Sequence, residues 1–454
     1  MCKNLVVSSM ITRQNTTDQL GLFHGLGEQL DQKHPLYLLA NKINWSVFDS
    51  QFEPLYSEKM GAPAKPIRLM VSLLILKYLR NLSDENLVEQ WSENIYYQYF
   101  GGEQFFRPSQ PCVATELVAF RNRIGESGME LILQESIRIN KPPKEEDMGD
   151  VISVDTTVQE KNITYPTDDK LHKKIIKSCI KIAEKEGLSL RQTYTKEIKE
   201  LSFEQRFKKR KNGSQIARKA NKRIKTIAGR LVRDISFKLS DEGLLTYSSD
   251  IALYRRVLSQ KRGDSNKIYS LHEPDVKCYA KGKEHKKFEF GSKVSIAVCQ
   301  NTGIILGARN FTETLHDSKT LPEVLDQYER INGKQARQVF VDRGYRGISS
   351  YKGSKILVPK PDINITTEQR KCHSKRAAIE PVIGHLKHQY RLCRNYLKGV
   401  AGDKINVILA AAAMNFKRAI NLWKKEAKLS WQFICNFIAT VFRLFIAQNL
   451  KMTF

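Results

Sequence analysis

The segment Val151-Ile152-Ser153-Val154-Asp155 is a short run rich in β-branched residues that ends in a carboxylate. Apolar runs of this kind are typical of a central strand that is buried on both faces of a sheet. We therefore expect a buried strand here, with Asp155 at or near its end. The segment predicts a sheet protein, and the rest of the sheet should lie on either side of it.

Further strands are predicted only beyond residue 287. Two adjacent segments, Phe288 to Val298 and Gly303 to Ala308, have the β pattern and are joined by a tight turn at 301–303. A helical stretch follows Leu321, and a fourth strand, Gln338 to Val341, ends at Asp342. Ile356 to Val358 is a candidate fifth strand. The order β-β-β-α-β predicts a multidomain α/β fold with a mixed sheet flanked by helices.

About a hundred residues, Thr164 to Asn266, separate the first predicted strand from the second and have a mainly helical pattern. From Leu171 to Arg233 there are twenty Lys and Arg residues against five Glu, a local net charge of +15. A solvated helix face is one interpretation. The density of one charge sign favours contact with phosphates, and hence a DNA-binding insertion. A regular apolar stripe in this stretch predicts a buried helix face: Ile224, Ile227, Ala228, Leu231, Val232 and Ile235.

The region before the first strand is predicted to be helical from Leu36 to Asn140. Pro66 precedes a strongly apolar segment, Ile67 to Leu79, and Ser83 is placed to cap the next helix. Gly125 is a candidate helix end. Two sets of residues have the spacing of buried helix faces: Leu87, Val88 and Trp91, then Leu117, Phe120 and Ile124. Arg121 and Arg123 lie off the second face, where DNA contact and plain solvated charge are both open interpretations.

Composition points to a polyanionic partner. The chain has 454 residues, a net charge of +27 and a pI near 9.6, so nucleic acid is the leading candidate. Its eight cysteines are scattered without zinc-site spacing, and no secretory signal is evident, so we expect a cytoplasmic protein. No glycine-rich ATP loop is present in the sequence.

The C-terminal part is predicted to be helical. Asp403 is a candidate N-cap for a helix whose core face would be Ile405, Ile408, Leu409, Ala412 and Phe416. The apolar stretch Trp431 to Leu450 is interrupted by polar residues, so we interpret it as a helix packed on the protein and expect no membrane association.

Three acidic residues stand out by position. Asp155 and Asp342 follow strands that would be neighbours, and Glu380 lies in a predicted helix, Arg376 to Arg391, that could cross nearby. Converging carboxylates repel one another unless cations neutralise them, and such oxygen ligands suit Mg²⁺ or Mn²⁺. Two such ions support in-line attack on a phosphodiester. The pattern therefore predicts nuclease or strand-transfer chemistry.

The sequence around each acid strengthens this hypothesis. Residues 154–157 (Val-Asp-Thr-Thr), 341–347 (Val-Asp-Arg-Gly-Tyr-Arg-Gly) and 378–387 (Ala-Ile-Glu-Pro-Val-Ile-Gly-His-Leu-Lys) resemble, in order, the three catalytic motifs of DDE transposases of bacterial insertion sequences. Arg376, Glu380 and Lys387 match the Y-R-E-K signature of one large transposase group, with His373 in the Tyr position. The resemblance extends roughly from residue 40 to residue 420.

The resemblance implies a ribonuclease-H-like catalytic fold, with Asp155, Asp342 and Glu380 as catalytic and metal-binding residues. It also implies two Mg²⁺ ions per active site, with Mn²⁺ as a substitute. The partners would be the terminal inverted repeats of the element and the target DNA, bound by a homo-oligomer, a dimer for synapsis of two ends. The implied domains are a helical N-terminal domain (36–140), a catalytic domain (150–420) with its insertion at about 166–266, and a helical tail (421–454).

Five residues near these motifs are candidate DNA contacts, each with a structural alternative. Arg376 and Lys387 could reach phosphates or merely pair with Glu380 along the helix. His373 could donate to a phosphate or lie on the surface. Arg343 and Tyr345 could contact DNA or pack in their loop.

Two other function classes stay open. A catalytically inactive, transposase-derived DNA-binding protein would need only the basic insertion and the helical N-terminal region. A ribonuclease-H-like nuclease that cuts without joining would share the metal chemistry. The pair His316-Asp317 has no assigned role.

Overall fold

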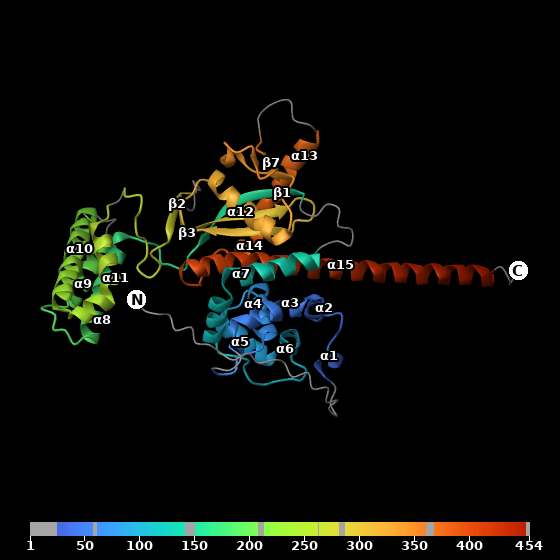
Figure 1. Ribbon diagram of the computed structural model, residues 1–454, viewed down its shortest axis with the longest axis horizontal. Helices are drawn as coiled ribbons and strands as arrows, with labels where there is room; N and C mark the ends of the chain where they lie inside the picture. The colour runs from blue at the N-terminus through green and yellow to red at the C-terminus, as the bar shows by residue number, and fades with distance from the viewer. Residues whose placement is uncertain are drawn as a thin grey trace.

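A computed structural model of the chain describes residues 25–57, 61–140, 150–207, 213–261, 263–280, 287–359 and 367–450. Within the last range, only the backbone is described at 368–369, 372–373, 427, 429–431 and 433–450. The architecture is mixed α/β: helices at the N-terminus, a mixed sheet, a separate helical lobe between the first two strands, and a long C-terminal helix (Figure 1).

The N-terminal region is helical, as predicted. Ser83 accepts a hydrogen bond from the Asn86 amide and caps α5, and Gly125, at φ 59°, interrupts α7. Both apolar faces are buried, and α4 has the predicted bounds. The elements are α1 (Leu26–Gln29), α2 (Pro35–Lys42), α3 (Trp45–Phe52), the 3-10 helix η1 (Glu53–Leu55), α4 (Ile67–Leu79), α5 (Asp84–Glu93), α6 (Ile95–Gly101) and α7 (Ala114–Asn140).

Arg121 corrects one expectation for this region. Its guanidinium is buried and donates two hydrogen bonds, of 2.9 and 2.8 Å, to the Asp84 carboxylate. Lys77 pairs with the same carboxylate at 2.8 Å. Arg121 therefore ties α7 to α5 and does not project toward solvent, so the interpretation of projecting arginines is wrong at this position.

The sheet has seven strands in the order β2-β3-β1-β5-β7-β6, with β4 paired to β3. The five predicted strands are confirmed, and β2 and β6 were not predicted. The pairs β1/β5 and β5/β7 are parallel and the others antiparallel. The strands are β1 (Val151–Glu160), β2 (Lys277–Ala280), β3 (Phe288–Cys299), β4 (Ile305–Phe311), β5 (Gln338–Phe340), β6 (Ser350–Tyr351) and β7 (Ser354–Leu357), with α12 at Asp317–Asn332 and the 3-10 helix η2 at Arg343–Tyr345.

Strand β1 is twice as long as predicted, and Asp155 lies in its middle. The cause is its pairing: β3 follows β1 from Ile152 to Glu160, whereas β5 pairs with it only as far as Ser153. The prediction that Asp155 ends the strand is therefore wrong for the β3 side. On the β5 side, Asp155 lies just beyond the last paired residue.

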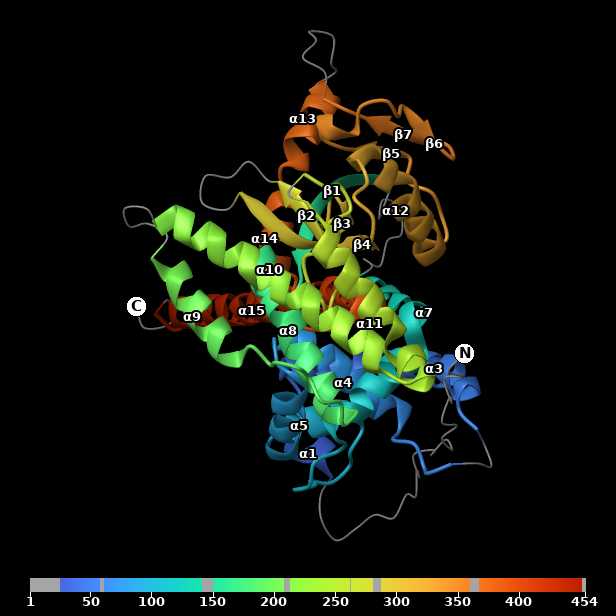
Figure 2. The same ribbon diagram turned by 90° about the vertical axis from the view of Figure 1, so that its left-hand side faces the viewer.

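Four helices form a lobe between β1 and β2: α8 (Asp168–Lys185), α9 (Thr195–Arg206), α10 (Gly213–Lys238) and α11 (Asp241–Ser259). Figure 2 shows this insertion lobe in front of the sheet. The predicted apolar stripe of α10 is buried and belongs to a hydrophobic core confined to the lobe. A second core runs without interruption from the N-terminal helices to the sheet and the start of the C-terminal helix.

The predicted helix 376–391 is broken into α13 (Thr367–Arg376) and α14 (Ile379–Gln389). Pro381 explains the break, because it has no amide hydrogen and its ring would clash with the carbonyl of Ala377 in a continuous helix. Pro381 is instead the third residue of α14, where an amide hydrogen has no helical partner. Arg376 and Glu380 thus belong to different helices.

Helix α15 (Gly399–Leu450) runs between the sheet and the N-terminal helices and packs on α7, α4 and β4 (Figure 1). Its predicted core face is buried. Asp403 is inside the helix, so it is not an N-cap; it pairs with Lys161 at 2.8 Å. The side chains that would test the packing of Trp431 to Leu450 lie outside the described residues, and no described helix is long and apolar enough to cross a membrane.

Candidate active site

Asp155 and Asp342 come together because β1 and β5 are parallel neighbours. The last paired residues are Ser153 and Phe340, and each aspartate lies two residues beyond its strand's member of this pair. In a parallel pair the two chains advance in step, so both carboxylates emerge at the same edge of the β1/β5 pair. The predicted adjacency of these strands is confirmed.

Asp155 is largely shielded from water and surrounded by charge. Its side chain is 19% exposed, and its Oδ1 accepts a 2.7 Å hydrogen bond from the Thr156 amide. Burial, with a smaller contribution from the negative charge of Asp342, raises the pKa of Asp155 to about 6. Arg376 opposes this effect, with its Nη1 3.9 Å from Asp155 Oδ2. The carboxylate is therefore held where its charged form lacks full compensation.

Asp317, the first residue of α12, is a third acid at this site. Its Oδ1 accepts hydrogen bonds from Thr156 Oγ1 at 2.7 Å and Lys293 Nζ at 2.9 Å. Its charge also raises the pKa of Asp155. Sequence reasoning left Asp317 unassigned. The available signal was an acid in the first turn of a helix that directly follows a strand.

Gly344 lies between Asp317 and Asp342. A Cβ atom on this glycine would lie 2.9 Å from Asp317 Oδ2, closer than real Cβ contacts, and 3.0 Å from Asp342 Oδ1, which is also tight. Its amide donates a 2.9 Å hydrogen bond to Asp342 Oδ1. The glycine thus permits both carboxylates to approach the same backbone and fixes the orientation of one of them.

Arg343 and Tyr345 flank this glycine and differ in exposure. Arg343 is exposed, so it stays a candidate DNA contact. Tyr345 is fully buried in the core, and its pKa is raised well above its usual range by burial and by the charges of Asp155 and Asp317. Stacking of Tyr345 on a DNA base is therefore contradicted, and the loop-packing alternative holds.

Glu380 is the predicted acid that the structure does not bring to the pair. It lies in the first turn of α14, which packs beside β1, and its side chain is exposed. Among the described residues, no group of three or more His, Cys, Asp or Glu side chains is arranged to hold a metal ion. Lys387 lies 3.9 Å from the buried Glu289, and the side chain of His373 lies outside the described residues.

The residues at this site fit a divalent cation by their chemistry. Asp155 and Asp342 supply hard carboxylate oxygens, with Asp317 beside them, and the pKa of Asp155 is raised first by burial and then by the charges of the other two acids. A cation bound between like charges relieves that repulsion.

Comparison with known proteins agrees with this geometry. A family model described as "Transposase domain (DUF772)" matches residues 24–123, and a model described as "Transposase DDE domain" matches residues 264–416. The chain belongs to the DDE transposases of insertion sequences. The second match contains Asp317, Asp342 and Glu380, while Asp155 and the insertion lobe of this transposase precede it.

One curated relative of the transposase is an uncharacterized protein, ORF8 in the nfe locus of Rhizobium meliloti. It is 38% identical over 169 residues, which is 37% of this chain and 81% of the relative. No solved structure matches the transposase.

Proposed function

We propose that this transposase binds the terminal inverted repeats of its insertion sequence, cleaves DNA strands at the element ends and joins the freed 3′-hydroxyl to target DNA. The observation that carries the proposal is the placement of Asp155 and Asp342, each two residues beyond the last pair of the parallel strands β1 and β5. The order of strands and helices supports a ribonuclease-H-like catalytic domain.

Asp155 and Asp342 are the residues we propose to hold the metal ions, with Glu380 as the third ligand. Two Mg²⁺ ions, or Mn²⁺ in their place, would supply charge neutralisation and activation of the attacking oxygen at a phosphodiester. Glu380 is the family's third acid by its motif. Because its side chain is exposed on α14, a shift of α14 toward β1 when DNA binds would complete the set.

Asp317 and Arg376 have supporting roles in this proposal. Asp317 fixes Thr156, the residue next to Asp155, through the 2.7 Å hydrogen bond of its carboxylate. Arg376 reaches Asp155 at 3.9 Å, which is longer than a hydrogen bond, so its guanidinium is available to a phosphate that enters the site. Lys387, His373 and Arg343 are proposed to contact DNA around the scissile bond.

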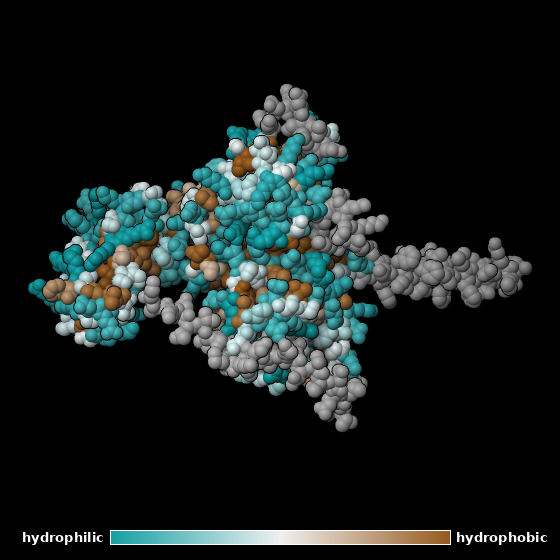
Figure 3. All heavy atoms as spheres, viewed as in Figure 1, coloured by the Kyte–Doolittle hydropathy of each residue, from teal (hydrophilic) through white to brown (hydrophobic). Residues whose placement is uncertain are grey.

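The insertion lobe is proposed to bind duplex DNA of the element ends. The lobe has a buried apolar core of its own, and lysines and arginines of α8 and α10 lie on its outside. Figure 3 shows hydrophilic residues over much of the lobe. Binding of two ends in one complex favours a dimer.

Two alternatives are tested by the same experiment. Purified protein is incubated with labelled element-end DNA and target DNA in Mg²⁺ or Mn²⁺, and wild type is compared with Asp155→Ala, Asp342→Ala and Glu380→Ala. The proposal expects wild type to cleave and join, and each variant to bind DNA without doing either. Binding without cleavage by wild type would favour an inactive DNA-binding protein, and cleavage without joining would favour a nuclease.

A further inference from the structure

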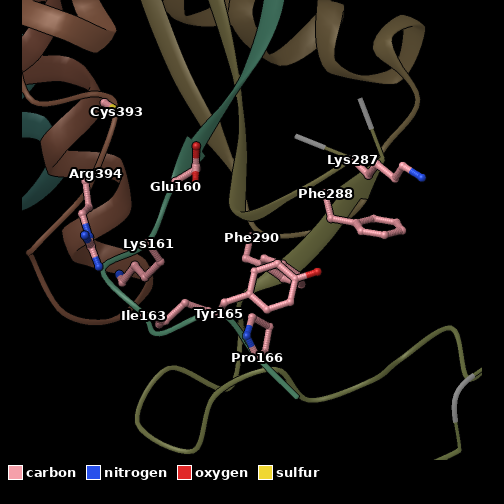
Figure 4. A pocket seen from close by; sticks show the side chains of 10 residues that line it. All are labelled: Glu160, Lys161, Ile163, Tyr165, Pro166, Lys287, Phe288, Phe290, Cys393 and Arg394. Carbon is pink, nitrogen blue, oxygen red and sulfur yellow. The ribbon is translucent and has the colours of Figure 1, made fainter. Parts of the chain in front are cut away.

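A hollow of about 730 Å³ opens at the far end of β1, five residues along the strand from Asp155. Two of its aromatic side chains are exposed to solvent: Tyr165 at 60% and Phe288 at 43%. Figure 4 shows Tyr165 beside Phe290, with Arg394 across from them and Lys287 beyond Phe288. We call this space the β1-end hollow, lined by Glu160, Tyr165, Phe288, Phe290, Lys287 and Arg394 among others.

The aromatic side chains are held in position. Phe290 packs edge-on against Tyr165, with ring centroids 5.4 Å apart, and tilted against Tyr269, at 5.2 Å. Phe288 and Phe290 are two residues apart on β3, and Tyr165 follows β1. The rings of Tyr165 and Phe288 are therefore exposed, flat apolar surfaces, and that of Tyr165 is held by Phe290; such surfaces suit a flat ligand.

The β1-end hollow adjoins two others, because it shares lining residues with both. Cys393 and Arg394 also line a hollow of about 580 Å³ beside α14, which contains Lys387, Arg391 and the 56%-exposed Tyr396. Pro166 also lines a hollow of about 1130 Å³ against α10, which contains Arg218, Lys219, Lys222 and Lys225. The three hollows thus run from the helix that carries Glu380 to the basic lobe.

Charge in these hollows is mainly positive once local pairing is considered. In the α10 hollow, Asp168 is paired with Lys267 at 2.9 Å. In the α14 hollow, Asp84 is paired with Lys77 and Arg121. Among the described residues that line these two hollows, the other acids are Asp169 in the α10 hollow and Glu85 in the α14 hollow. The hollows therefore offer basic side chains with exposed aromatic rings between them.

We propose that these adjoining hollows form a track for an unpaired strand of DNA, with the exposed rings stacking on bases and the basic side chains contacting phosphates. Duplex DNA would satisfy the cations but present no base faces to Tyr165, Phe288 and Tyr396. Basic grooves with interspersed aromatic side chains are the general solution for single-stranded nucleic acid. The inference rests on the proposed function for its substrate class, since strand cleavage at an element end releases such a strand.

The test compares affinities by fluorescence anisotropy for labelled oligothymidine of about 12 nucleotides and for a duplex of the same length. The double variant Tyr165→Ala/Phe288→Ala should bind oligothymidine about ten-fold more weakly and change little on duplex. The conservative variant Tyr165→Phe/Phe288→Tyr should restore binding. Phe237→Ala is the matched control, because Phe237 is 89% exposed on α10 and lines none of the three hollows.

A second pair of variants tests the phosphate contacts. Arg218→Ala/Lys222→Ala should lower the salt dependence of oligothymidine binding, by roughly 0.7 in the log-log slope for each lost contact. Lys334→Ala/Lys355→Ala removes the same charge from exposed positions after α12 and on β7 that line none of the hollows and lie outside the lobe, and should leave the slope unchanged.

Equal weakening on both DNAs in the aromatic variant, or no weakening on oligothymidine with an unchanged thermal melt, would overturn the proposal. Strand cleavage by wild type is scored separately. An inert wild type that still shows the aromatic-dependent preference for oligothymidine would contradict the proposed function and leave the track standing. Cleavage by wild type without that preference would contradict the track and leave the proposed function standing.

Discussion

Thr156 donates its hydroxyl hydrogen bond to Asp317 over 2.7 Å, and this bond joins the middle of β1 to the first turn of α12. Lys293 on β3 reaches the same carboxylate oxygen at 2.9 Å. Three elements are therefore fixed at the residue next to Asp155. Thr156, next to the candidate catalytic Asp155, is thus held by an acid that lies 161 residues further along the chain.

Replacement of Asp317 by Asn should lower strand cleavage by at least about ten-fold, because the amide cannot pair with Lys293 and holds Thr156 more weakly. Asp326→Asn is the matched control, since Asp326 lies on the same helix and pairs at the surface with Lys352. Cleavage rates and thermal melts of both variants would be measured. Full activity of Asp317→Asn would exclude a positioning role.

Replacement of Asp155 by Asn should stabilise the metal-free protein at high pH. A raised carboxyl pKa means that the folded state disfavours the charged form, so stability falls as the pH rises from about 3.8 to about 6 and stays low above it. The shift corresponds to an upper limit of about 3 kcal/mol. Urea unfolding in a chelator should show Asp155→Asn more stable than wild type at pH 8 and little different at pH 4. A difference of the same size at both pH values would contradict this cause.

Addition of Mg²⁺ should remove the loss of stability that charged Asp155 causes in wild type at high pH. Bound cations favour the charged form of Asp155, so the melting temperature of wild type should rise with Mg²⁺ at pH 8, and much less below pH 6 where Asp155 is protonated. Asp155→Asn should show a smaller rise at either pH. A rise in the melting temperature that is equal in wild type and variant would place the binding site elsewhere.

Replacement of Gly344 by Ala should reduce cleavage by about ten-fold or more, because the new methyl group would meet both Asp317 and Asp342 within about 3 Å. Gly384→Ala is the control: it lies inside α14 with no atom within 4 Å of its Cβ position, and Ala favours a helix. Cleavage assays and melts of the two variants would separate displacement of the acids from a general effect of added volume.

Replacement of Lys161 by Met should destabilise the protein by about 3 to 5 kcal/mol, since two buried acids lose their counter-ion. Lys161 pairs with Asp403 at 2.8 Å and with Glu273 at 3.3 Å, and its side chain is 2% exposed. Lys170→Met, at an exposed site on α8, is the control and should change the free energy of unfolding by less than about 1 kcal/mol. Urea unfolding measures both.

The sequence predicted the strands, the buried helix faces and the adjacency of Asp155 and Asp342, because each of these depends on local periodicity or on strand order. It could not predict partners that are distant in the chain. Arg121 lies off its helix's apolar stripe, yet Asp84 draws it into the interior. Asp317 gains its significance only from Thr156 and Lys293, which no spacing rule links to it.

Two features of the backbone, the length of β1 and the break before α14, also differ from the sequence-based prediction. β1 extends to Glu160 because β3 pairs with it along that whole length, which is a tertiary effect. Pro381 lies within the predicted helix 376–391, and the structure breaks the helix just before it. Glu380 therefore lies in the first turn of a separate helix, and its approach to the aspartate pair stays a prediction.

The ion pair of Lys161 with Glu273 closes the base of the insertion lobe, because one residue precedes the lobe in the chain and the other follows it. The lobe has its own hydrophobic core, and this ion pair joins the two chain segments that lead into and out of it. The lobe is therefore a self-contained module. The segment between Lys161 and Glu273 can gain, lose or exchange residues in evolution without altering the strand pairing that places Asp155 beside Asp342. The proposed recognition of element ends by the lobe and the proposed cleavage chemistry of the sheet can therefore change independently in one polypeptide.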